Sequence, residues 1–173
     1  MNKLIKLIME LYWRFFTSPE RYAKHLGVDI GTNNLIKKMH WSSEPYLIKV
    51  GSNCQLTNCR IFTHGGGQVV RDEHPEFDVF GKVTIGNWVY IGTNSLIMPG
   101  VTIGDNVLIA AGSVVTKSIP NRKVVAGNPA RIICSIDEYY ERNKMYDQGT
   151  KGLDDSTKRG ILLNAEYESF LRK

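Results

Sequence analysis

Aliphatic residues recur at every sixth position through the middle of the chain. From residue 85 onward, each sixth position holds a β-branched aliphatic side chain: Ile85, Ile91, Ile97, Ile103, Ile109 and Val115. A second register holds only small or β-branched side chains: Val89, Ser95, Val101, Val107, Ser113 and Ile119. A period of six fits neither the turn of an α-helix nor the heptad of a coiled coil, and it is typical of a parallel β-helix built from hexapeptides. The pattern therefore predicts a mainly β fold.

The position three residues after each aliphatic residue indicates a corner. Most of these positions hold residues that tolerate the left-handed backbone of a type II turn, namely Asn94, Gly100, Asn106 and Gly112. Three hexapeptides would close one triangular coil of 18 residues, so residues 83–118 predict two complete coils. Successive coils would stack about 4.8 Å apart, with the aliphatic columns inside as the core.

The same pattern begins earlier in the chain and is then interrupted. It holds at Ile30, Val50, Leu56 and Phe62, and it places Cys54 at a small inward position where it is expected to be buried. No aliphatic column can be drawn across residues 64–82. We interpret this segment as a loop that leaves one corner, and long loops on a repeat scaffold are usually functional.

The chain is predicted to form one domain over residues 1–173. Residues 1–26 are expected to form two helices, the second beginning at Pro19. The β-helix is expected over residues 27–134, and residues 135–173 are expected to form a helical cap and a tail.

A broad apolar stripe runs along residues 2–16. With Lys3, Lys6 and Arg14, this segment could lie on an anionic membrane surface; packing against the β-helix or a second copy is the simpler interpretation. The stripe is too short to cross a bilayer and is interrupted by Glu10, so neither a transmembrane helix nor a secretory leader is predicted.

Composition and charge narrow the function classes. The 173 residues are 42% hydrophobic and 23% charged, which excludes global disorder. The net charge of +5 suits an anionic partner, but the basic residues do not cluster with stacking aromatics, so nucleic-acid binding is not predicted. Three cysteines without a CxxC pair argue against a disulfide framework and a zinc site, and they suit a reducing cytoplasm.

The run from Ile85 to Ile133 resembles the hexapeptide-repeat acyltransferases, with PGVTIGDN, AAGSVVTK and AGNPARII as its most specific pieces. The segment SEPYLIKVG followed by THGG is similar to the branch that O-acetylates sugars of lipopolysaccharide and capsule. The resemblance covers about residues 27–140. It implies a left-handed parallel β-helix with flanking helices, a homotrimer, and acetyl-CoA bound in the groove between neighbouring subunits.

Acetyl transfer from a thioester to a hydroxyl needs a base, donors for the oxyanion and a coenzyme A site, with neither a covalent intermediate nor a metal required. Histidine suits the role of base near neutral pH. His25 and His40 precede the regular repeat, and His74 lies far out in the charged part of the loop. His64 follows a strand directly, and the family's catalytic histidine falls in the matching THGG, so His64 is predicted to be the base.

The loop also offers carboxylates, since Asp72 or Glu73 could orient the imidazole. The resemblance assigns coenzyme A binding to Thr93, Ala111, Thr116, Lys117 and Arg131. In that assignment the backbone N–H of Thr93 binds the oxyanion or thioester carbonyl, and Ala111 lines the pantetheine channel. The two cations, Lys117 and Arg131, meet the phosphates or the adenine end.

Two departures from the family pattern stand out. Gly65 follows the histidine where the family more often has an acid, and Trp88 occupies a corner that otherwise holds Asn or Gly. A Trp with a left-handed backbone would be strained, so that corner either takes another turn type or holds an aromatic ring that stacks on a sugar.

The predicted function is an acetyl-CoA-dependent O-acetyltransferase acting on a sugar or lipid-linked sugar. An N-acetyltransferase of an amino sugar, a serine acetyltransferase and a non-catalytic scaffold are the alternatives.

Overall fold

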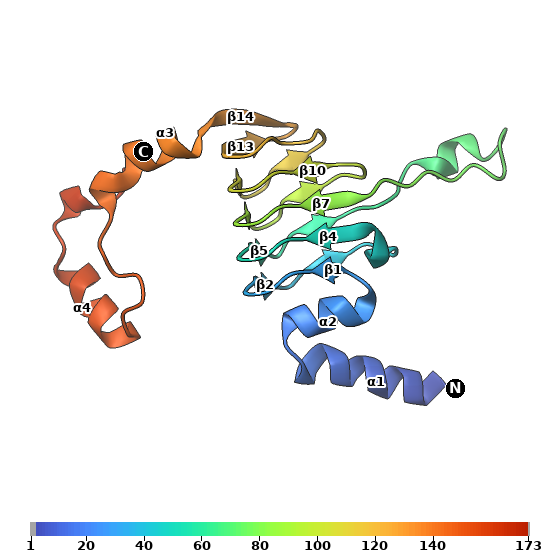
Figure 1. Cartoon of the computed structure of the whole chain (residues 1–173), viewed down its shortest axis with the longest axis horizontal. Helices are drawn as coiled ribbons and strands as arrows, with labels where there is room; N and C mark the ends of the chain where they lie inside the picture. The colour runs from blue at the N-terminus through green and yellow to red at the C-terminus, as the bar shows by residue number, and fades with distance from the viewer. Residues whose placement is uncertain (1–2, 173) are drawn as a thin grey trace.

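The centre of the chain is a three-sided column of short strands, described for residues 3–172 in this computed structural model (Figure 1). The first sheet contains β1 (Asp29–Ile30), β4 (Ile48–Val50), β7 (Val83–Ile85) and β10 (Thr102–Ile103). The second contains β2 (Leu35–Lys37), β5 (Gln55–Thr57), β8 (Tyr90–Ile91), β11 (Leu108–Ile109), β13 (Lys123–Gly127) and β14 (Ala130–Ser135). The third contains β3 (His40–Trp41), β6 (Arg60–Ile61), β9 (Leu96–Ile97) and β12 (Val114–Val115). Each coil passes through the first, second and third sheet in turn, and all pairings between these strands are parallel except that of β13 with β14.

The six-residue registers form the core, as the sequence predicts. Ile85 pairs with Ile103 and Ile91 with Ile109, a spacing of 18 residues per coil. Every member of both registers is buried, the most exposed being Ile119 at 7%. The column is therefore held by aliphatic side chains stacked in its interior.

The first two coils have a longer spacing and an irregular corner, and this corner makes one sequence prediction wrong. Ile36 pairs with Leu56 and Trp41 with Ile61, 20 residues apart. The corner at Asn58 is one residue shorter than a hexapeptide corner, so Ile61 occupies the buried column and Phe62 is only half-buried.

Side chains at the corner between the first and second sheets connect successive coils. Each accepts a hydrogen bond from a backbone N–H of the preceding coil: Ser52 from Thr32 (3.1 Å), Asn87 from Ser52 (2.9 Å), Asp105 from Asn87 (2.6 Å) and Asn121 from Asp105 (2.9 Å). The coils approach so closely here that a Cβ on Gly86 would lie 2.4 Å from an oxygen of Asp105. This close approach explains why glycine follows the aliphatic residue at this corner.

The corner positions adopt the left-handed backbone that the sequence predicts at Asn94, Gly100, Asn106 and Gly112. Trp88 also has a positive φ, of 57°, so the expectation of another turn type is wrong. The backbone N–H of Trp88 bonds to the Ser52 carbonyl at 3.0 Å, which holds this corner in line with the coil below while the indole stays exposed.

Helices lie at both ends of the column (Figure 1). At the first end are α1 (Lys3–Phe16) and α2 (Pro19–Leu26), and α2 is capped by Ser18 and ends at Gly27. At the other end β14 lies against β13, and the chain continues into α3 (Ile136–Asn143) and α4 (Asp155–Asn164), which bury no residue. Short 3-10 turns cover Pro45–Leu47, Gly67–Val70, Lys144–Tyr146 and Tyr167–Ser169.

The N-terminal apolar stripe lies on α1. The side chains of Lys3, Lys6 and Arg14 lie outside the described part of the structure. Within residues 3–172 there is no helix whose length and apolar character would let it cross a bilayer.

Cys54, Cys59 and Cys134 are free and buried, and burial raises the pKa of the Cys59 thiol to about 12, so this thiol stays protonated at neutral pH.

We predict that Trp88→Asn stabilises the protein. Asn tolerates a positive φ far better than Trp, so relief of backbone strain should raise the free energy of unfolding by about 1 kcal/mol in urea titrations. Tyr90→Asn is the control, because it replaces an exposed aromatic in the neighbouring strand and should destabilise. A loss of stability in Trp88→Asn would mean that packing of the indole outweighs the strain.

Candidate active site

His64 stands where the chain leaves the column. It follows β6 at the corner between the third and first sheets, and the segment 64–82 then extends away as an arm (Figure 1). The arm returns at Phe80, which pairs with His64 in an antiparallel bridge, and the two rings lie 5.8 Å apart. The histidine is therefore positioned by the column rather than by the far part of the arm.

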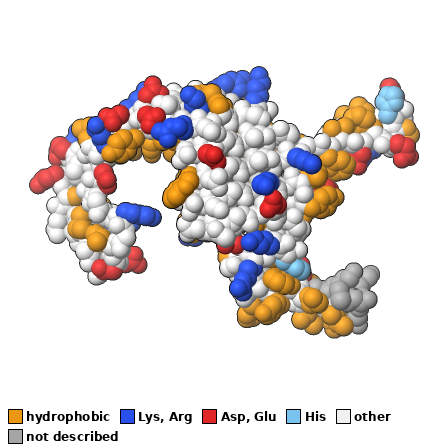
Figure 2. Space-filling view, viewed as in Figure 1, with side chains coloured by type: hydrophobic (Ala, Val, Ile, Leu, Met, Phe, Trp, Pro, Cys, Tyr) orange, Lys and Arg blue, Asp and Glu red, His pale blue; other side chains and the backbone are white. Residues whose placement is uncertain are grey.

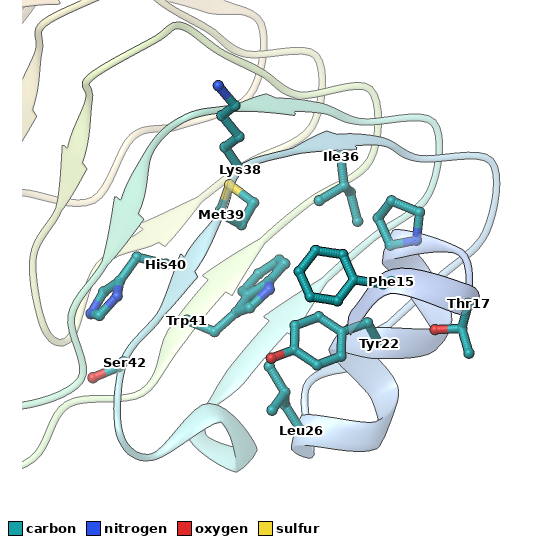
Figure 3. Close-up of a pocket in the computed structure, with 11 residues that line it drawn as sticks. Phe15, Thr17, Tyr22, Leu26, Ile36, Lys38, Met39, His40, Trp41 and Ser42 are labelled. Atoms are coloured by element: carbon teal, nitrogen blue, oxygen red, sulfur yellow. The ribbon is translucent and has the colours of Figure 1, made fainter. Parts of the chain in front are cut away.

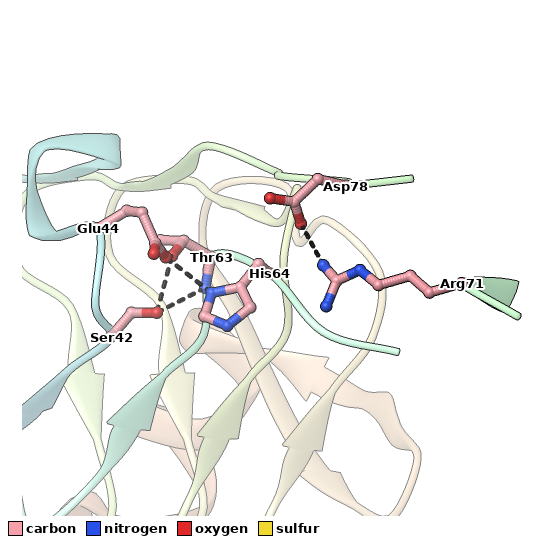
Figure 4. Close-up of polar contacts among 6 residues, drawn as sticks. All are labelled: Ser42, Glu44, Thr63, His64, Arg71 and Asp78. Atoms are coloured by element: carbon pink, nitrogen blue, oxygen red, sulfur yellow. Dashed lines mark hydrogen bonds and ion pairs between the residues drawn. The ribbon is translucent and has the colours of Figure 1, made fainter. Parts of the chain in front are cut away.

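A chain of hydrogen bonds fixes the imidazole (Figure 4). Nδ1 of His64 lies 2.7 Å from Oε2 of Glu44, and the hydroxyl of Thr63 donates to the same oxygen at 2.7 Å. The Ser42 hydroxyl lies 2.7 Å from that of Thr63 and accepts from the Thr63 backbone N–H at 3.2 Å. Since the Thr63 proton goes to Glu44, Ser42 donates to Thr63, and the network runs in one direction toward the carboxylate.

The charge of Glu44 decides which ring nitrogen carries the proton. The hydrogen bond from Thr63, reinforced by those from His64 and Ser43, lowers the pKa of the Glu44 carboxyl below its ordinary 4.5 against the opposing effect of desolvation. The carboxylate therefore persists at neutral pH and is lost only as the pH falls below that value. An ionised carboxylate only accepts, so Nδ1 holds the proton and Nε2 presents a lone pair. The His64 side chain is 41% exposed, which leaves the ring accessible to a substrate.

The carboxylate partner differs from the sequence expectation. Asp72 and Glu73 are exposed on the arm, whereas Glu44 comes from the coil below His64. Glu44 precedes His64 by 20 residues, which is the spacing that pairs Trp41 with Ile61. The 20-residue separation is therefore present in the sequence, but it identifies Glu44 as the partner of His64 only once the length of the early coils is known.

The other histidines have different surroundings. The His25 ring stacks on Trp13 with centroids 4.4 Å apart, between α1 and α2. His40 lies on the outer face of β3, its ring 6.2 Å from that of Phe62, and His74 is exposed on the arm. His64 alone among the four donates a hydrogen bond of 2.7 Å to a carboxylate.

The residues assigned to coenzyme A fall into two groups. Lys117 and Arg131 line one cavity of about 350 Å³, and Thr116 is exposed next to Lys117. Thr93 and Ala111 lie instead at the corner between the second and third sheets, where the Thr93 carbonyl accepts from the N–H of Gly112 at 2.9 Å. In one chain, Lys117 therefore lies at the same corner of the column as His64, between the third and first sheets, whereas Thr93 lies at a different corner.

A larger cavity of about 510 Å³ lies between the N-terminal helices and the first coil (Figure 3). Its walls include Phe15 at the end of α1, Tyr22 of α2 and Trp41 of β3. Ser42 is also part of its wall, and the Ser42 hydroxyl belongs to the network of His64. This cavity therefore adjoins the candidate catalytic group.

Comparison with known proteins agrees with this architecture. The bacterial transferase hexapeptide family (six repeats) matches residues 82–117. Protein CapG of Staphylococcus aureus is 40% identical over 169 residues, 95% of this chain and 97% of CapG. The galactoside O-acetyltransferase of Escherichia coli K12 is 38% identical over 74% of this chain and 62% of its own length. The chain belongs to the hexapeptide-repeat acetyltransferase family.

Solved structures place this acetyltransferase among left-handed parallel β-helices. A maltose O-acetyltransferase from Clostridium difficile 630 superposes with a TM-score of 0.55 at 29% identity, over 78% of this chain and 89% of the other. A galactoside acetyltransferase in complex with coenzyme A gives 0.57 at 26% identity, over 80% and 82%. The match to CapG also extends beyond residues 27–140, so the end segments of this acetyltransferase are shared with a relative.

We predict that Glu44→Gln lowers kcat of this acetyltransferase by about tenfold to a hundredfold, the scale of one hydrogen bond to a charged group. The amide preserves the shape of the network but removes the negative charge that faces the imidazole. Steady-state kinetics should show an unchanged KM for acetyl-CoA. Glu73→Gln on the arm is the matched control and should behave as wild type; the reverse result would transfer the partner role to Glu73.

Proposed function

We propose that this acetyltransferase transfers the acetyl group of acetyl-CoA to a hydroxyl of a sugar or surface-polysaccharide precursor. The observation that carries this proposal is the His64 imidazole, held by Glu44 with the Nε2 lone pair available at an accessible ring. The names of the galactoside and maltose O-acetyltransferases support a sugar acceptor. The resemblance of SEPYLIKVG and THGG to the surface-polysaccharide branch supports the precursor class.

The proposed reaction is a direct attack on the thioester. Nε2 of His64 removes the proton from the acceptor hydroxyl while the hydroxyl oxygen bonds to the acetyl carbonyl carbon. The tetrahedral oxyanion collapses, the carbon–sulfur bond breaks, and the coenzyme A thiolate takes the proton from the imidazolium. Glu44 offsets the positive charge that the imidazole acquires. No covalent acyl-enzyme is needed because the thioester is already activated.

We assign coenzyme A binding to the cavity lined by Lys117 and Arg131 and to the corner that holds Thr93 and Ala111. Lys117 and Arg131 bring two positive charges to one cavity, which suits the phosphates of coenzyme A. The backbone N–H of Thr93 would donate to the oxyanion, and Ala111 would line the pantetheine channel. Ala111 is small and exposed, which leaves room for the pantetheine part of coenzyme A to pass over it.

The separation of the two groups supports a homotrimer. The third sheet lies between the corner of Thr93 and the corner of His64, so a single column cannot close one pocket around both. Three columns packed with their third sheets toward a common axis would bring the Thr93 corner of one copy against the His64 corner of the next. The groove between copies would then hold acetyl-CoA.

We predict that His64→Ala lowers turnover by roughly two to four powers of ten, the scale of a lost general base. A free-thiol assay on panels of sugar hydroxyls and of amines would measure the loss and separate O-transfer from N-transfer. His74→Ala is the control, because His74 is exposed on the arm. Near-wild-type turnover in a folded His64→Ala protein would remove His64 from the mechanism, and turnover with amines alone would overturn O-acetylation.

We predict that Lys117→Ala weakens coenzyme A binding about tenfold in calorimetry, the scale of one charge-assisted hydrogen bond. Arg131→Ala should have an effect of similar size because both side chains line the same cavity. Lys82→Ala, an exposed lysine at the end of the arm, is the control. Unchanged affinity in both cavity variants would show that the phosphates bind elsewhere.

A further inference from the structure

Helix α1 presents an apolar face that the rest of the described chain does not bury. Large apolar side chains along it are between 44% and 78% exposed: Ile5, Ile8, Met9, Leu11 and Phe16. Figure 2 shows hydrophobic side chains gathered at this end of the molecule, beyond the first coil. A soluble surface rarely leaves so many neighbouring apolar side chains exposed unless they bind something.

The opposite side of α1 is the one that the protein holds. The Tyr22 hydroxyl donates to Glu10 at 2.7 Å, and the Trp13 ring stacks on His25 with an interplanar angle of 8°. Glu10 and Trp13 are three residues apart and share a helix face, whereas Ile8, and Phe15 two turns after it, lie on the opposite face by helical periodicity. The contacts with α2 thus hold the side of α1 that carries Glu10 and Trp13 and leave the side of Ile8 exposed, while Phe15, at the end of that side, lines the cavity beside the first coil.

The column does not need α1 to complete its core. Ala23, Val28 and Ile30 are already buried beneath α2 and the first coil. Most of the apolar stripe is therefore not packed on the β-helix, and only Phe15, at the end of α1, lines a cavity with Ile36 and Trp41 of the first coil. The grooves proposed to join copies of the chain run along the sides of the column, whereas α1 lies beyond its end (Figure 1).

The charge and composition of residues 3–26 indicate what binds the exposed face of α1. Residues 3–26 contain five basic and two acidic residues. A net positive segment with Leu, Ile, Tyr and Phe on one helix face matches a helix that lies in the interface of an anionic membrane. We propose that α1 binds the surface of an anionic lipid membrane, with its axis in the plane of the interface and the column standing on the membrane.

Membrane docking bears on the acceptor, and this step rests on the proposed function. The 510 Å³ cavity has Phe15 of α1 in one wall and Ser42 in another, and Ser42 connects through Thr63 and Glu44 to His64. His64 lies in the second coil, close to the α1 end of the column. A sugar carried on a membrane lipid would therefore arrive at the end of the column nearest the catalytic group.

Vesicle co-sedimentation of the full chain tests the docking. The wild type should bind vesicles of phosphatidylglycerol and phosphatidylcholine, bind phosphatidylcholine alone weakly, and lose affinity as salt is raised. Ile8→Glu should weaken binding to the mixed vesicles about tenfold or more, because it removes an aliphatic group that the membrane would bury and adds a negative charge that the anionic lipid repels. Leu163→Glu, at an exposed position of α4, is the matched control and should bind as wild type.

Two further measurements separate the possible failures. Sedimentation velocity shows whether Ile8→Glu changes the assembly. No vesicle binding by the wild type, together with a smaller assembly of the variant, would overturn membrane docking in favour of contact between copies.

Acetylation of a free glycoside and of the same sugar as a long-chain glycolipid in mixed vesicles tests the acceptor. Ile8→Glu should lose about tenfold on the glycolipid alone, following its loss of membrane affinity. Equal loss on both would contradict the role of docking, whereas vesicle binding without acetylation of either sugar would contradict the proposed function instead.

Discussion

The close stacking of one coil on the next is the constraint on which the rest of the structure depends. Backbone N–H groups of each coil donate to carbonyls one coil above, as from Gly51 to Ile85 at 2.8 Å and from Gly86 to Ile103 at 2.8 Å. This spacing leaves no room for a Cβ at these glycines and forces aliphatic side chains into continuous inner columns. It also sets which polar groups meet, because a residue lies beside the one that occupies the same place in the preceding coil. Glu44 reaches His64 for this reason.

The hexapeptide register could be predicted because burial acts directly on the sequence pattern. An inward position tolerates only aliphatic or small side chains, so Ile85 and its successors identify the column without any structure. Phe62 was misplaced because an irregular corner at Asn58 shifts the register by one residue, and such a corner leaves no hydrophobic signal. The Glu44–His64 pair was missed for a related reason, since it depends on the 20-residue length of the early coils.

Trp88 shows a limit of residue preferences. Taken alone, a Trp argues against a left-handed corner, yet the hydrogen bond from its N–H to Ser52 and the buried Val89 beside it fix the backbone there. The contacts between successive coils outweigh the free-energy cost of a left-handed backbone at one residue. The placement of α1 was equally beyond the sequence, because a helical stripe specifies a face but not what covers it.

The hairpin at the far end of the column has a consequence for end-to-end association of columns. A stack of parallel strands exposes unpaired backbone groups at its last rung, and these could template another chain without limit. Here β14 turns back antiparallel on β13 in the second sheet, follows Pro129 and carries Arg131, while α2 lies against β1 and β2 at the opposite end. Proline and charge at an edge strand disfavour the addition of another strand, so end-to-end growth of columns is opposed at the second sheet.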